Sequence, residues 1–175
     1  MLVAMNHQVF DSLDEVSLIW ACIEPTIQKI RGKNFAIKAD AYTHLTIGQQ
    51  ALLMFQILYG HTSIGVTEFY CLIPYLPSKG GIWQELKKGM QHFEDYSMLQ
   101  LLSKMERDYY ALEEKALREG IESLDVCINN LGKDSELLST IRQHDIIFNE
   151  TIPKTIKLIS SYIRNNPSEF IQFCE

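Results

Sequence analysis

The chain has 175 residues, of which 46% are hydrophobic and 22% are charged, so it can bury a sizeable core and is most simply one domain. No apolar run reaches 18 residues, and the start, MLVAMNHQVFDSLDE, lacks the basic and apolar regions of a signal peptide. The four cysteines contain no CxxC pair, which predicts free thiols in a cytoplasmic protein, with Cys22 and Cys127 packed as small hydrophobic residues. No membrane partner is therefore expected.

The net charge of −6 is distributed unevenly along the chain. Residues 1–93 hold seven acidic and seven basic side chains, residues 94–125 hold nine and four, and residues 126–175 hold six and five. The longest basic run is the lysine pair at 87–88. Because binding to a phosphate backbone needs a basic patch, the sequence predicts no direct contact with nucleic acid.

The first predicted helix lies in the stretch FDSLDEVSLIWACIEPTIQKIRG. Ser12 precedes Glu15 by three residues, which is the spacing of a capping box. Pro25 is expected to kink or end this helix near Glu24, and Gly32 to stop the chain from continuing it. The apolar residues that follow the predicted cap recur at helical spacing: Leu13, Val16, Ile19, Trp20 and Ile23.

The stretch THLTIGQQALLMFQILYG gives the strongest helix signal. Thr46 precedes Gln49 by three residues, a second capping-box spacing, and the residues that follow are apolar almost without a break. A helix that is apolar on most sides is a buried one. We therefore predict a central core helix over 46–59, with Gly60 as the residue just past its end.

The next stretch, IGVTEFYCLIPYL, has the composition of a strand but no visible partner strand, so a helix that ends before Pro74 or Pro77 is favoured. The segment PSKGG is predicted to be a loop, and IWQELKKGMQHF an amphipathic helix. A long helix follows, which continues or breaks near Gly120. Its core stripe is Leu99, Leu102, Met105, Tyr109, Leu112 and Ala116.

Two further helices are predicted toward the end of the chain. Asp134 would cap the first, and Pro153 would lie in the first turn of the second, where proline is tolerated. The terminal NNPSEFIQFCE is interpreted as a turn of helix or a tail. The predicted fold is all-α: a single-domain irregular bundle of about seven to nine helices around the buried helix 46–59.

Motifs for catalysis and cofactor binding are absent from the sequence. There is no HExxH, GxSxG, GxGxxG or P-loop, which predicts no metal, no cofactor and no enzymatic activity. Polar residues do gather at one predicted helix corner, within HTSIGVTEFY. A small hydrolase or ligand-binding site at 60–70 therefore stays open as an alternative, using His61, Glu68 and Tyr70.

Acidic residues crowd the long helix and the residues after it. A solvated helix face is the simpler interpretation, and a negative stripe that attracts a basic protein is the functional one. The residues that would bind such a partner are Glu106, Asp108, Glu113, Glu114, Glu119, Glu122 and Asp125.

The stretch LTIGQQALLMFQILYGHTSIGVTEFY resembles the hallmark of an uncharacterised bacterial all-helical family that includes a DNA-mimic protein. Gly60, Gly65, Phe69 and Tyr70 match the family pattern, and the resemblance extends over roughly 45–120. Departures occur where His61 replaces an acidic residue, Ser63 and Ile64 replace an Asn pair, and Val66 and Thr67 replace Gly-Phe. The resemblance implies an all-helical fold, no catalysis, and a carboxylate surface that sequesters a DNA-binding protein.

The leading hypothesis is a non-enzymatic interaction protein, and its more specific form is a mild DNA mimic that binds a basic, DNA-binding protein. A net charge of −6 is low for full mimicry. A homodimer and a toxin-neutralising immunity protein stay open as alternatives.

Overall fold

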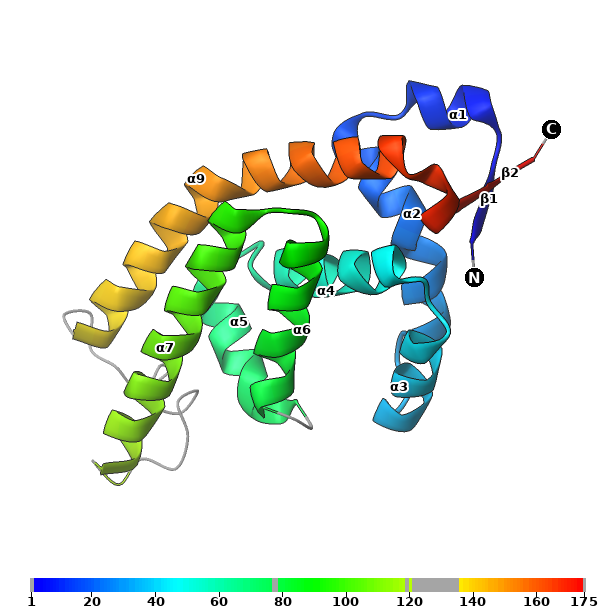
Figure 1. The fold of residues 1–175 in the computed structure, drawn as a ribbon. Helices are drawn as coiled ribbons and strands as arrows, with labels where there is room; N and C mark the ends of the chain where they lie inside the picture. Colours follow the sequence, from blue (N-terminus) through cyan, green and yellow to red (C-terminus); the bar gives the residue numbers. More distant parts are fainter. Residues whose placement is uncertain (1, 77–78, 119, 121–135, 175) are drawn as a thin grey trace.

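The computed structural model describes residues 2–76, 79–118, 120 and 136–174, and its fold is all-α, as predicted (Figure 1). The described helices are α1 (His7–Ser12), α2 (Glu15–Ile30), α3 (Phe35–Thr43), α4 (Ile47–His61), α5 (Val66–Leu72), α6 (Lys79–His92), α7 (Tyr96–Arg118) and α9 (Glu136–Asn165). Two 3₁₀ turns, η1 (Ile73–Tyr75) and η2 (Pro167–Glu169), and two short strands, β1 (Val3–Met5) and β2 (Ile171–Phe173), complete them.

Helix α4 is the buried central helix that the sequence predicts. Leu52, Phe55 and Leu58 are fully buried on it, and α6 and α2 pack against it. Its capping box is formed: the Thr46 hydroxyl accepts the Gln49 N–H at 3.1 Å, and the Gln49 side chain accepts the Thr46 N–H at 3.3 Å. These local signals fixed the start of the helix correctly.

The predicted end of α4, at residue 59, is wrong by two residues. Gly60 lies inside the helix, which ends at His61 with Thr62 as its C-cap. The Thr62 hydroxyl donates to the Tyr59 carbonyl at 3.3 Å and the Ser63 hydroxyl to the Gly60 carbonyl at 2.9 Å, so side chains satisfy carbonyls of the last turn and no glycine is needed there.

Pro25, expected to kink or end its helix, and Pro153, expected in a first turn, both lie inside helices. α2 continues through Pro25 to Ile30, and Asp14, not Ser12, caps its start. The two helices predicted after residue 134 are one 30-residue helix, α9, with Pro153 in its interior. Packing of α9 against α2, α5 and α7 outweighs the lost hydrogen bond. Figure 1 shows α9 changing direction along its length, as a proline kink produces.

The segments between α4 and α6 agree with the prediction in part. The ambiguous stretch after Gly65 forms helix α5, as expected. The predicted loop PSKGG is wrong at its end, because α6 begins at Lys79. The cap predicted at Asp134 lies outside the described residues, as does Cys127. None of the described helices is long and apolar enough to cross a membrane.

The chain ends pair with one another, which the sequence did not indicate. β1 and β2 form a two-stranded parallel sheet in which Val3 faces Ile171 and Met5 faces Phe173. Figure 1 shows the first and last segments side by side at one end of the molecule. The terminal segment, predicted to be a turn of helix or a tail, is a 3₁₀ turn followed by a strand.

Candidate functional site

The predicted helix corner does not bring its three residues together. His61 and Glu68 face each other with Nδ1 and Oε1 3.9 Å apart, and both side chains are exposed. Tyr70 is fully buried and packs edge-on against Trp83 and Tyr109 in the core. Two positions along α5 separate Glu68 from Tyr70, which places them on opposite sides of the helix.

Tyr70 instead belongs to a polar chain that links α5, α9 and α7 and runs from the core at Tyr70 and His144 to partly exposed residues on α7. Its hydroxyl lies 2.8 Å from Nδ1 of His144, and Nε2 of His144 lies 2.9 Å from Oδ2 of Asp108. Lys104 Nζ contacts the same carboxylate oxygen at 2.7 Å and lies 3.1 Å from His144 Nε2. We call Tyr70, His144, Asp108 and Lys104 the polar chain.

At neutral pH the polar chain favours a neutral imidazole at His144. Burial lowers the pKa of His144, and the charge of Lys104 lowers it further, against a smaller opposing effect of Asp108. Burial also raises the pKa of Tyr70. Partial burial raises the pKa of Asp108, but hydrogen bonds from Lys104 and His144 bring the net shift below its ordinary value.

Two proton arrangements satisfy the polar chain. With the proton on Nε2, His144 donates to Asp108 and accepts from Tyr70. With the proton on Nδ1, His144 donates to Tyr70, whose hydroxyl donates to the Met105 carbonyl at 3.2 Å, and Nε2 accepts from Lys104. Because Tyr70 and His144 have no exposed surface, neither can reach a substrate in this conformation.

The acidic residues of α7 are largely paired within the molecule. Helix α7 carries four acidic and four basic residues, so it has no net charge. Glu106 pairs with Lys87 at 2.7 Å, and Glu114 pairs with Arg118 one turn along the helix. Asp108 belongs to the polar chain, and Glu113 is half-buried on the same helix. The remaining predicted partner-binding residues lie outside the described part of the chain: Glu119, Glu122 and Asp125.

Part of the acidic excess of 94–125 has a structural role. Asp95 is buried and caps α7 by accepting the Met98 N–H at 2.9 Å, and the Thr155 hydroxyl of α9 donates to its other oxygen. This carboxylate is therefore not available to a partner. The acidic partner surface stays a prediction, and its unpaired charge would have to come mainly from residues after α7.

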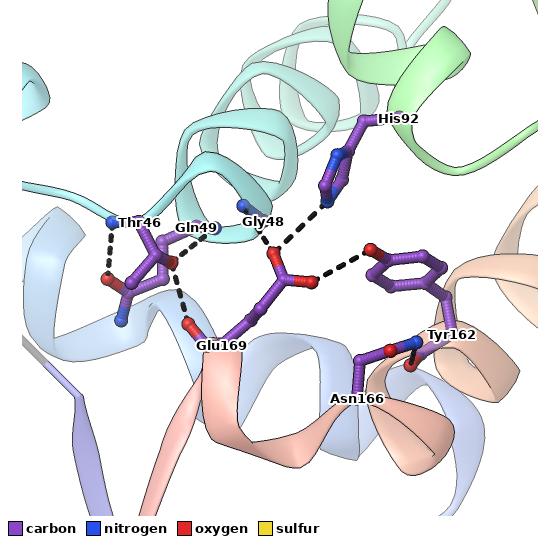
Figure 2. Close-up of polar contacts among 7 residues, drawn as sticks. All are labelled: Thr46, Gly48, Gln49, His92, Tyr162, Asn166 and Glu169. Carbon is purple, nitrogen blue, oxygen red and sulfur yellow. Dashed lines mark hydrogen bonds and ion pairs between the residues drawn. The ribbon is translucent and has the colours of Figure 1, made fainter.

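A second polar cluster joins the C-terminal segment to the start of α4 (Figure 2). The Glu169 carboxylate accepts the Gly48 N–H at 2.9 Å and the Tyr162 hydroxyl at 2.8 Å. His92 Nε2 lies 3.2 Å from it, outside hydrogen-bond geometry. The Thr46 hydroxyl donates to the Glu169 carbonyl at 2.6 Å. A carboxylate at a helix N-terminus is favourable, so the chain's own Glu169 fills this position.

The surface feature best suited to binding is a groove between α2, α4 and α9. One part is an apolar hollow of about 120 Å³, and the adjoining part is a larger hollow of about 360 Å³ that shares Gln56 and Tyr59 with it. The apolar part is lined further by Val16, Ile19, Trp20, Phe55 and Ile156. The second part is lined further by Gly60, Thr62, Ser63, Phe148, Asn149 and Ile152. We call the two parts together the α2–α4–α9 groove.

Two properties distinguish this groove. Its lining contains no charged residue. Val16 and Trp20, one turn apart on α2, are 48% and 41% exposed at its edge, although the sequence predicted both for the core. The sequence did not reveal the groove, because its walls come from three distant segments. The polar end of the groove does lie at the predicted 60–70 corner, but His61, Glu68 and Tyr70 do not line it.

Comparison of the chain with models of known protein families, with curated proteins and with solved structures finds no match. The fold and the groove thus define an all-α protein with an uncharged surface groove. The family resemblance described above stays a prediction.

Proposed function

We propose that the protein is a non-enzymatic protein-interaction module and that the α2–α4–α9 groove is its contact surface. The observation that carries the proposal is the exposure of Val16 and Trp20 beside an apolar hollow. Clustered exposed apolar side chains next to a concavity favour association, and tryptophan is among the residues that contribute most to binding energy.

The chemistry of the groove supports binding over catalysis. Apart from Tyr59, its lining contains no titratable side chain, so it offers no acid, base or thiol near neutral pH. The residues with shifted pKa values in the polar chain are buried elsewhere, between α5, α7 and α9. Their role in this proposal is to hold these helices together.

Site-specific photo-cross-linking tests the proposal. A photoreactive phenylalanine analogue at Val16 should give a discrete adduct with a partner in cell extract, and the additional change Trp20→Ala should abolish it. The same analogue at Ile37, an equally exposed residue on α3, is the matched control. If the analogues at Val16 and Ile37 give the same set of cross-linked products, the proposal is contradicted.

A basic partner for the acidic residues of 94–125 is a separate prediction from the sequence. Charge reversal at Glu113, Glu114 and Glu122 should weaken capture of a basic protein and leave helicity unchanged. Capture of the same partners before and after reversal would contradict it.

A small ligand at the 60–70 corner is a second candidate function. The observation that favours it is the larger hollow, whose lining includes Thr62, Ser63 and Asn149. Uncharged hydroxyl and amide groups would suit a neutral, hydrogen-bonding molecule. Neutral compounds of this kind are screened by melting temperature. At least one should raise the melting temperature of the wild-type protein and leave that of Ser63→Trp, in which the new side chain fills the hollow, unchanged.

A further inference from the structure

We propose that the occupant of the α2–α4–α9 groove is an extended, uncharged peptide segment that places one bulky apolar side chain between α2 and α4. The inference rests on the proposed function and adds the conformation and chemistry of the partner. A partner helix and an acidic or basic peptide are the alternatives that it rejects.

The first reason is a pair of carboxamides on opposite walls of the groove. Gln56 lines both hollows from α4, and Asn149 lines the larger one from α9. Neither side chain has a hydrogen-bond partner among the residues that the structure describes. A carboxamide offers both a donor and an acceptor, which is what the backbone of an extended chain requires. A helical partner has already satisfied its backbone groups internally.

The second reason is a backbone acceptor at the same place. Pro153 lies four residues after Asn149 within α9 and has no N–H. The carbonyl of Asn149 therefore lacks the intrahelical donor that every other carbonyl in a regular turn receives. Asn149 lines the larger hollow, so an incoming N–H group would meet the carboxamide oxygen of this residue there.

The third reason is the shape and charge of the groove. The apolar hollow of about 120 Å³ can admit one large side chain, whereas a helical partner needs a longer apolar trough for its residues at i, i+3, i+4 and i+7. Past Tyr59 the lining becomes polar, with Thr62 and Ser63. Without a charged lining residue, a charged peptide side chain would lose hydration there and gain no partner.

Selection from a library of random linear 12-residue peptides tests the inference. The full chain is the target, and binders that also bind Trp20→Ala are removed. The remaining peptides are synthesised with a fluorescent label, and their affinity is measured by anisotropy. We expect uncharged sequences with one bulky apolar residue. The double change Gln56→Ala and Asn149→Ala, or methylation of one backbone nitrogen next to that residue, should weaken binding at least tenfold. Gln91→Ala, an exposed carboxamide on α6, is the matched control.

The outcomes separate the inference from the function on which it rests. Three results with peptides that need Trp20 would overturn the inference and leave the interaction role intact. The peptides could bind as helices, they could carry essential charges, or they could tolerate both backbone methylation and the loss of both carboxamides. A homodimer that Trp20→Ala converts to monomer in light scattering would do the same, since the second copy would then be the occupant. Failure to select any peptide that depends on Trp20 would overturn both.

Discussion

The hydroxyl of Tyr70 lies 2.8 Å from Nδ1 of His144, and this contact joins α5 to α9 inside the core. Both side chains are fully buried, and the far side of the imidazole meets Asp108 and Lys104 of α7. Three helices from distant parts of the chain therefore meet at one ring. The protonation state of that ring affects the stability of their packing.

Stability should decrease as the pH falls below 6.5 because of His144. The pKa of this ring is lowered in the folded protein from its ordinary value of 6.5, mainly by burial. Below pH 6.5 the unfolded chain therefore binds the proton more readily than the folded one, which favours unfolding until the pH passes the folded pKa. Urea denaturation between pH 5 and 8 should show this slope in the wild type and a flatter one in His144→Gln. His44→Gln, which removes an exposed imidazole, is the control. An unchanged slope in His144→Gln would contradict the assignment.

Two glycines of α4 should respond to alanine in opposite ways. A Cβ at Gly48 would lie 2.5 Å from Glu169 Oε2 and 2.7 Å from Phe170 Cζ, whereas one at Gly60 would meet no atom within 4 Å. Gly48→Ala should therefore cost about 1–3 kcal/mol through overpacking. Gly60→Ala should stabilise the helix by roughly 0.5–1 kcal/mol, because alanine loses less backbone entropy. Chemical denaturation of both variants checks the pair, and equal effects would contradict the fit of the C-terminal segment against α4.

Two neighbouring lysines on α6 should differ in their contribution to stability. Lys87 and Glu106 form an ion pair in which each side chain is less than one-fifth exposed, whereas the Lys88 side chain is two-thirds exposed. Lys87→Met should cost about 1–3 kcal/mol, because it leaves a largely buried carboxylate without its cation. Lys88→Met should cost less than about 1 kcal/mol, the usual range of an exposed pair. Comparable urea midpoints for the two variants would show that Glu106 is not held in this pair.

Two cysteines should differ in their reactivity with maleimide at neutral pH. Burial raises the pKa of Cys22 to about 12, while Cys174 is exposed near the chain end. Because the thiolate is the reactive form, Cys22 should be modified only as fast as the core opens, and Cys174 within the time of mixing. Peptide mapping by mass spectrometry measures both rates. Early modification of Cys22 would contradict its burial.

Local signals in the sequence predicted local structure well. Thr46 and Gln49 marked the start of α4, and the apolar spacing after Tyr96 predicted α7, because both signals depend on neighbours within one or two turns. Pro153 did not mark a helix start and Pro25 did not end its helix, since the local cost of a proline is small beside the packing of a whole helix. Each lies in the interior of a helix that several others hold in place.

The candidate site was much less predictable than the fold. The sequence grouped Tyr70 with His61 and Glu68, which are near in the chain, but its hydrogen-bond partner is His144, on another helix. The groove depends on how α2, α4 and α9 cross, and spacing within one helix contains no such information. The available hints were a tryptophan in an amphipathic helix, and Asn149 four residues before Pro153.

The parallel pairing of β1 with β2 has a consequence for how the protein moves. Val3 and Ile171 lie at opposite ends of the described chain, and the ladder that joins them has only three residue pairs. We expect so short a sheet to open more readily than the buried helices. Hydrogen exchange should be faster at the amides of β1 and β2 than at those of α4, which would identify the paired termini as a separate, low-stability unit of unfolding.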